Sequence, residues 1–167
     1  ILIDKLNEAI QIDKEKIDRP IILQLLILIE NAYKNEINLE LEESNKNIFV
    51  DQLIQLLLVC LPISYLDNDD QKIQSAESFL FLISLNHPMM SDPHNLAMLC
   101  SLALVFIIIV KPPKQIMKQL RAFVKSVFQD EQGQVVYNEL LSLPLTERFG
   151  KECLERIEKL MGSQNNQ

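Results

Sequence analysis

Four basic residues recur at intervals of four, three and four positions in a chain that is acidic overall: Lys114, Lys118, Arg121 and Lys125. On an α-helix, with about 3.6 residues per turn, this spacing places them on one face as a continuous row of positive charge. Lys111 precedes the row and extends it, and we call the five residues the basic ridge. Such a ridge can pair with carboxylates or phosphates of a partner. It can also be a solvated helix face, because lysine favours helices and keeps its charged head in water.

The helix that must carry the ridge is predicted over residues 113–128. Apolar side chains occupy the face opposite the ridge: Ile116, Leu120, Phe123, Val124 and Val127. This amphipathic pattern predicts a surface helix packed on a core. Pro112 and Pro113 end the preceding apolar run, and Pro113 suits the first turn of a new helix, where its missing N–H has no intrahelical partner.

The charge of the chain is unevenly distributed. The net charge is −7, but residues 1–95 hold 16 acidic and 7 basic residues, whereas residues 96–167 hold 7 and 9. A chain this acidic is a poor general binder of nucleic acid, because affinity for phosphate depends mainly on cations. The local ridge still permits contact with phosphates, and it could equally meet an acidic protein surface.

No pattern for catalysis or cofactor binding is visible in the sequence. The three glycines are isolated, so that neither a P-loop nor a dinucleotide-binding fingerprint can be drawn. His87 and His94 flank Asp92 and could in principle hold a metal, but no cysteine or second carboxylate lies nearby in sequence. A polar loop between helices is the better interpretation of that segment. We therefore predict a protein that is not an enzyme and that needs no metal, nucleotide or other cofactor.

The cysteines indicate a reducing compartment. Cys60, Cys100 and Cys153 are odd in number and far apart, so neither a disulfide framework nor a zinc-binding spacing is present. We expect reduced thiols and an intracellular protein, cytoplasmic or nuclear.

The run from Leu96 to Val110 contains no charged residue. It is shorter than the roughly 20 residues needed to cross a bilayer, so it predicts a buried central helix and no membrane contact. The β-branched end of the run, from Phe106 to Val110, leaves a strand as the alternative for those residues.

Prolines and polar clusters divide the chain into segments with helical periodicity. A first amphipathic stretch covers residues 2–17, further helices are predicted to begin near residues 20, 47, 71, 95, 113, 134 and 146, and the last ends at 161. Asn47 is a candidate N-cap after the acidic stretch 35–47. We predict an all-α fold of about seven to eight antiparallel helices in one domain, residues 1–161, followed by a flexible polar tail, 162–167. Because the chain begins at Ile1 without a methionine, we expect a fragment of a longer protein.

Paired helices give units of roughly 35 to 50 residues, near the 40 to 47 of HEAT and armadillo repeats. From Pro20 to Met161 the chain resembles such an array in its apolar helices, its prolines at helix ends and its few glycines. No internal repeat aligns residue by residue, and an irregular helical bundle would give the same pattern. The resemblance implies a right-handed array with an extended surface for a partner.

The predicted function is that of a protein–protein interaction scaffold, which binds a peptide or helix of a partner within a larger assembly. If the ridge is the site, its cations pair with acidic or phosphorylated residues, while a neighbouring apolar groove supplies most of the affinity. Candidate exposed anchors are Tyr137, Phe149 and Met161, although such side chains more often belong to the core, and Phe149 and Met161 also lie in the predicted buried stripe of the last helix. The alternative is a helical module that contacts nucleic-acid phosphates through residues 111–125. The sequence does not fix the partner or the oligomeric state.

Overall fold

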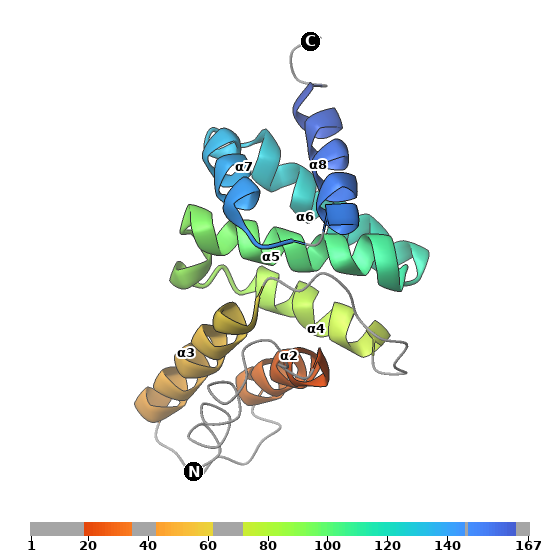
Figure 1. Ribbon diagram of the computed structural model, residues 1–167. Helices are drawn as coiled ribbons and strands as arrows, with labels where there is room; N and C mark the ends of the chain where they lie inside the picture. Colours follow the sequence, from red (N-terminus) through yellow and green to blue (C-terminus); the bar gives the residue numbers. More distant parts are fainter. Residues whose placement is uncertain (1–18, 35–42, 62–71, 146, 163–167) are drawn as a thin grey trace.

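The computed structural model of the chain is built from α-helices (Figure 1). It describes residues 19–34, 43–61, 72–145 and 147–162. These residues form seven α-helices, a short 3₁₀-helix and a π-helical segment: α2 Arg19–Tyr33, α3 Glu43–Cys60, α4 Lys72–Ser84, η1 Pro88–Met90, α5 Pro93–Val105, η2 Phe106–Val110, α6 Lys114–Gln129, α7 Gly133–Ser142 and α8 Glu147–Gly162. The described residues contain no strand. The all-α prediction is confirmed.

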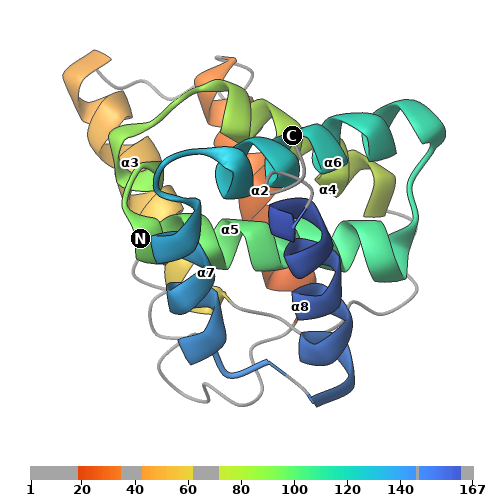
Figure 2. The same cartoon turned by 90° about the horizontal axis from the view of Figure 1, so that it is seen from above.

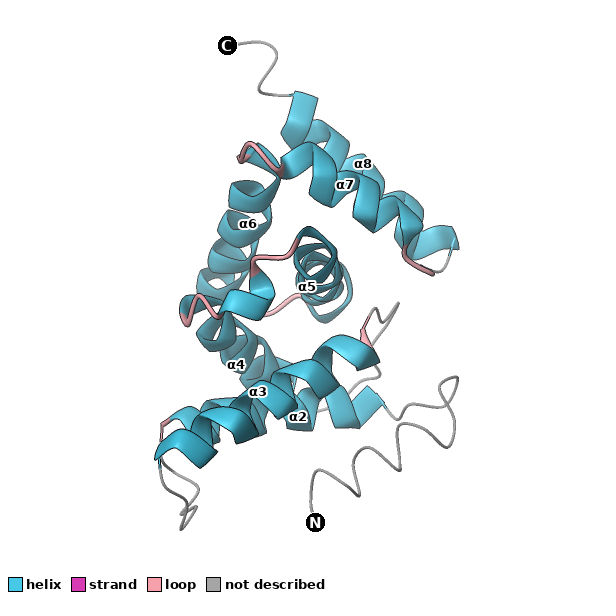
Figure 3. Ribbon diagram, turned by 90° about the vertical axis from the view of Figure 1, so that its left-hand side faces the viewer, coloured by secondary structure: helices cyan, strands magenta, loops and turns pink. Residues whose placement is uncertain are grey.

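The helices surround α5. Figure 3 shows α5 nearly along its axis, with α2 and α3 on one side of it and α7 and α8 on the other. Helix α5 packs against α3, α6 and α7, while α2 packs against both α3 and α4. In a HEAT or armadillo array consecutive helices pair in the same way in every repeat. Here α2 packs on α3 and α5 packs on α6, but α4 makes its main helix contacts with α2 and α6 rather than with α3 or α5. The described helices therefore form an irregular bundle and do not show HEAT or armadillo repeats.

Helix α5 is the most deeply buried element, as the uncharged run of the sequence predicts. Every residue from Ala97 to Ile107 is buried. Together with η2 it forms the one helix in the described residues that is long and apolar enough to cross a membrane, Pro93–Val110, 18 residues. Its neighbours bury 61% of that segment, as expected for the core helix of a soluble protein.

The C-terminal end of this central helix is π-helical and not a strand. The backbone N–H of Lys111 donates to the carbonyl oxygen of Phe106 at 2.8 Å and closes a wide turn. Lys111 itself has a left-handed backbone, with φ of 52°, which ends the helix. Pro112 follows, and Pro113 takes the N-cap position of α6 rather than the first helical position. The ridge helix therefore begins one residue later than predicted.

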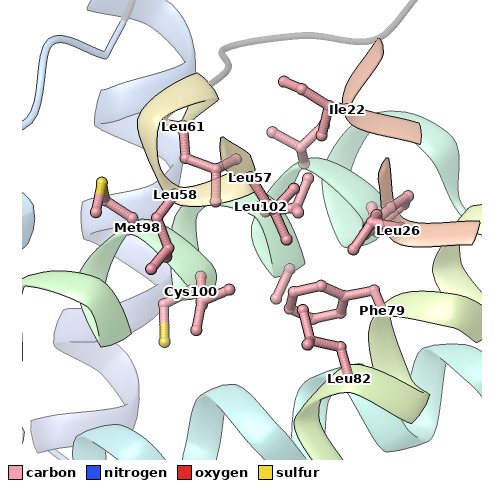
Figure 4. Packing of buried hydrophobic residues seen from close by; sticks show 14 of the residues in the cluster. Ile22, Leu26, Leu57, Leu58, Leu61, Phe79, Leu82, Met98, Cys100 and Leu102 are labelled. Carbon is pink, nitrogen blue, oxygen red and sulfur yellow. The ribbon is translucent and has the colours of Figure 1, made fainter. Parts of the chain in front are cut away.

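The core is one continuous cluster that runs from α2 to α8. Figure 4 shows side chains of four helices meeting: Ile22 and Leu26 from α2, Leu57 from α3, Phe79 and Leu82 from α4, and Leu102 from α5. The ring of Phe79 packs against those of Phe106 and Phe123, at 5.8 and 5.9 Å between centroids. These aromatic contacts tie α4 to the central helix and to the ridge helix.

A polar contact that the sequence did not reveal joins α2 to α4. The carboxylate of Glu30 accepts a hydrogen bond from the hydroxyl of Ser78 and pairs with Lys34. Burial raises the pKa of Glu30, but the hydrogen bonds from Lys34 and Ser78 outweigh it, and the pKa lies below its ordinary value. The charged form of Glu30 is therefore favoured at neutral pH.

The start of α3 differs from the prediction. Helix α3 begins at Glu43, so Asn47 lies inside the helix, and its prediction as N-cap is wrong. Asparagine is only a weak helix breaker, and packing of α3 on α2 overrides it. The helix predicted over residues 2–17, most of the acidic stretch 35–47 and nearly all of the tail lie outside the described residues.

The cysteines give a prediction that concerns reactivity. Cys60, Cys100 and Cys153 are buried and free. Burial raises the pKa of Cys60 to about 11 and that of Cys153 to about 12, and it raises that of Cys100 further. Because the thiolate is the reactive form, we expect no cysteine of the native protein to react with Ellman's reagent at pH 8, and all three to react after denaturation. Rapid labelling of a native thiol would contradict this burial.

Candidate functional site

The basic ridge is exposed along α6. Lys114, Lys118, Arg121 and Lys125 all point to solvent, and Lys111 is exposed just before the helix. On the opposite face Leu120 and Val124 are buried, as predicted. Three further predicted members of that face are half-buried: Ile116, Phe123 and Val127. Phe128 is also buried there, and its place four residues after Val124 could have identified it from the sequence.

The ridge cations have no partners in the described part of the chain. None of the five makes an ion pair or a side-chain hydrogen bond with a described residue, whereas Arg156 pairs with Glu152 at 3.2 Å. Like charges four residues apart on a helix destabilise it by about 0.2–0.5 kcal/mol. The pairs Lys114 with Lys118 and Arg121 with Lys125 have this spacing. The like charges of the ridge therefore destabilise α6 slightly.

A groove lies beside the ridge, between α6 and α8. Figure 2 shows α8 crossing α5, with its C-terminal part close to α6. The groove has a volume of about 630 Å³, within the range of pockets that hold ligands. Apolar side chains from four elements contribute to its floor: Leu104 of α5, Ile107 of η2, Val124 of α6 and Leu160 of α8. Three ridge residues form one wall: Lys118, Arg121 and Lys125. The ridge is therefore one side of a concave site.

The opposite wall of the groove belongs to α8. Its charged residues are Glu152, Glu155, Arg156 and Lys159, whose spacing places them on one helix face. Glu152 is paired with Arg156, while Glu155 is exposed and has no ion-pair partner among the described residues. This wall was not predicted from the sequence, although the spacing of its charged residues within α8 indicates a common helix face.

None of the three predicted anchors lines this groove. Tyr137 lies on α7, is half-buried, and does not line the groove. Its hydroxyl donates to Glu158 Oε1 at 2.7 Å. That hydrogen bond, with burial and the negative charge of Glu158, raises the pKa of Tyr137. Phe149 is only 6% exposed and belongs to the buried face of α8, so it is a core residue, as the predicted apolar stripe indicates, and not an exposed anchor. Met161 is half-buried.

The histidine loop forms structural contacts. His87 Nε2 lies 2.7 Å from Asp51 Oδ1, and His87 Nδ1 accepts from the N–H of Met89, so the loop is held against α3. His94 Nδ1 lies 2.9 Å from Glu139 Oε2 of α7. Asp92 caps α5 by accepting from the N–H of Asn95. The described residues contain no cluster of three or more potential metal ligands.

A second prediction follows from the absence of a phosphate loop in the sequence. We expect that neither a chelator nor millimolar ATP changes the melting temperature. A ligand that binds the folded protein, at a concentration far above its dissociation constant, would add a few kcal/mol to the free energy of unfolding. Differential scanning fluorimetry with EDTA and with MgATP measures this directly, and a clear shift with either would contradict the prediction.

No family model, curated protein or solved structure matches the chain. Its function must therefore be inferred from the geometry and charge of its own residues.

Proposed function

We propose that this chain is a non-enzymatic interaction module that binds an acidic segment of a partner protein through the basic ridge, within a larger assembly. The observation that supports this most strongly is the row of exposed cations without partners among the described residues. A helix that needed only a solvated face could alternate positive and negative charges and gain stability from their pairs. Here the charges have one sign over three turns.

The groove beside the ridge offers such a partner an apolar surface as well as positive charge. Exposed ion pairs contribute little affinity on their own, typically less than about 1 kcal/mol each. Apolar side chains that leave water in a concave site supply most of the binding energy, while complementary charge raises the association rate and excludes wrong partners. The ridge and the floor of the groove combine these two contributions.

The groove also favours a protein partner over a nucleic acid. A phosphate backbone gains from neutralising cations, but in this groove it would lie over an apolar floor and beside a wall in which Glu152 and Glu155 accompany Arg156 and Lys159. The buried thiols are in keeping with a reducing, intracellular location. The second candidate function, contact with phosphates through residues 111–125, rests on the ridge alone.

The salt dependence of binding separates the two functions. A partner is first captured from nuclease-treated extract on immobilised protein, and its purified binding segment is then titrated. Contact of five cations with phosphates would weaken binding by a factor on the order of 10² to 10³ between 50 and 200 mM salt. We expect a protein partner held partly by the apolar floor to lose much less. A loss as steep as that for phosphates, or disappearance of the partner after nuclease treatment, would favour the nucleic-acid function.

A further inference from the structure

We infer that the groove between α6 and α8 receives an amphipathic segment of a partner protein, with carboxylates along one flank and a basic residue on the other. This inference rests on the proposed function and adds where the partner lies and what chemistry it presents. It follows from the apolar floor and from the different charges of the two walls.

The α6 wall selects the acidic flank. Lys118, Arg121 and Lys125 face the groove, whereas Lys111 and Lys114 belong to the ridge but do not line it. The three cations extend over seven residues, or about 10 Å along the helix axis. Two turns of an acidic segment suffice to meet them. Arg121 can also hold a carboxylate through two parallel hydrogen bonds.

The α8 wall selects the other flank. The carboxylate of Glu155 has no ion-pair partner among the described residues, and Glu152 is already paired with Arg156. This wall also holds Arg156 and Lys159, but a carboxylate of the occupant placed beside Glu155 itself would be repelled. A lysine or arginine at that position of the partner would instead be attracted. The groove therefore distinguishes an amphipathic, asymmetrically charged segment from a uniformly acidic one.

Apolar side chains of the occupant would lie on the floor. Leu104, Val124 and Ile107 are buried among the helices, yet they reach the bottom of the groove. Leu160 is half-buried at its edge. Large apolar side chains at helical spacing would cover these groups, as amphipathic helices do in grooves of other proteins.

A substitution that fills the groove without changing its charge tests this placement. Ala122 is exposed on α6 and lines the groove, so Ala122→Trp should occupy space that the partner needs. Gln119 is exposed on the same helix but does not line the groove, so Gln119→Trp is the matched control. Both variants should fold, because both positions face solvent, and equal melting temperatures would verify this.

The probes are fluorescein-labelled synthetic peptides of about 14 residues, roughly four helical turns. One carries leucines on one helical face, glutamates on one flank and a lysine on the other. A second is a scramble of the same composition. A single-stranded oligonucleotide of matched length is the third probe. Binding is measured by fluorescence anisotropy on the whole chain at physiological salt.

We expect the wild type to bind the amphipathic peptide at least about tenfold more tightly than the scramble or the oligonucleotide. Ala122→Trp should weaken that binding at least about tenfold, and Gln119→Trp should leave it within about twofold. Replacing the lysine of the peptide by glutamate should weaken binding to the wild type but not to Glu155→Lys.

Several results would overturn the inference. These are absence of saturable binding of the amphipathic peptide, equal binding of the scramble or the oligonucleotide, and normal binding by Ala122→Trp. A second variant, in which Lys114, Lys118, Arg121 and Lys125 are all replaced by glutamate, separates the groove from the ridge. If Ala122→Trp binds a captured partner normally while this ridge-reversed variant does not, the groove is excluded and the proposed function of the ridge stands. If the ridge-reversed variant still binds the captured partner, the proposed function itself fails.

Discussion

Leu102→Asp is expected to unfold the protein. Leu102 is fully buried at the centre of α5, where the side chains of four helices meet (Figure 4). A carboxylate placed there would lose its water among the apolar side chains of the core, which costs several kcal/mol. The entire stability of a domain of this size is about 5–15 kcal/mol. We expect loss of the cooperative melting transition and of most helical circular dichroism at 37 °C.

The matched control is Leu141→Asp. Leu141 lies on α7 and is 52% exposed, so the same substitution there should change stability by no more than about 1 kcal/mol. A Leu102→Asp protein that melts near the wild-type temperature would show that α5 is not the central helix of the fold.

Reversal of the ridge is expected to abolish partner binding while the fold survives. The variant replaces four residues together by glutamate: Lys114, Lys118, Arg121 and Lys125. All four are exposed, and a change of an exposed charge usually costs less than about 0.5 kcal/mol. Glutamate at position 114 even favours the helix, because a negative charge suits a helix N-terminus. For an acidic partner, however, attraction becomes repulsion along the whole ridge, and we expect affinity to fall at least about a hundredfold.

The control for this reversal changes charge elsewhere on the surface. Arg148 and Lys151 are exposed on α8, and neither lines the groove between α6 and α8. Their replacement by glutamate makes the protein more acidic but leaves the ridge intact. We expect a small effect on affinity, limited to long-range repulsion that salt screens. Isothermal titration calorimetry with the captured partner, together with melting curves, compares the three proteins.

Local periodicity was sufficient to predict most of the helices. The apolar stripe and prolines of the ridge helix predicted its bounds to within one residue, because an amphipathic period and a helix-stopping Pro-Pro pair are both local signals. The uncharged run from Leu96 predicted the buried central helix, because the absence of charge over fifteen residues is also a local signal. The sequence predicted a helix through residue 110, with a strand as the alternative for residues 106–110, but it did not predict that this end is π-helical, because the same residues are compatible with α-helical and π-helical hydrogen bonding.

The arrangement of the helices could not be predicted in the same way. Helix lengths and spacing resemble a repeat array, yet α4 makes its main helix contacts with α2 and α6 rather than with the helices next to it in the chain, which no local pattern records. The groove has the same origin: Leu104 of α5, Val124 of α6 and Leu160 of α8 meet only when three helices pack together. The exposure of the ridge was predictable from the spacing of its residues. Which helix forms the other wall of the groove depended on tertiary packing.

Charge-swap rescue of partner binding is the most direct test of whether the basic ridge binds through its charge. Once the partner segment is known, its acidic residues are replaced by lysine, and the dissociation constants of both segments are measured against the wild type and against the ridge-reversed protein. If the ridge binds through charge, each mismatched pair should bind weakly, and the doubly reversed pair should recover most of the original affinity. Unchanged binding of the native segment to the ridge-reversed protein would contradict the account and show that the ridge is a solvated face.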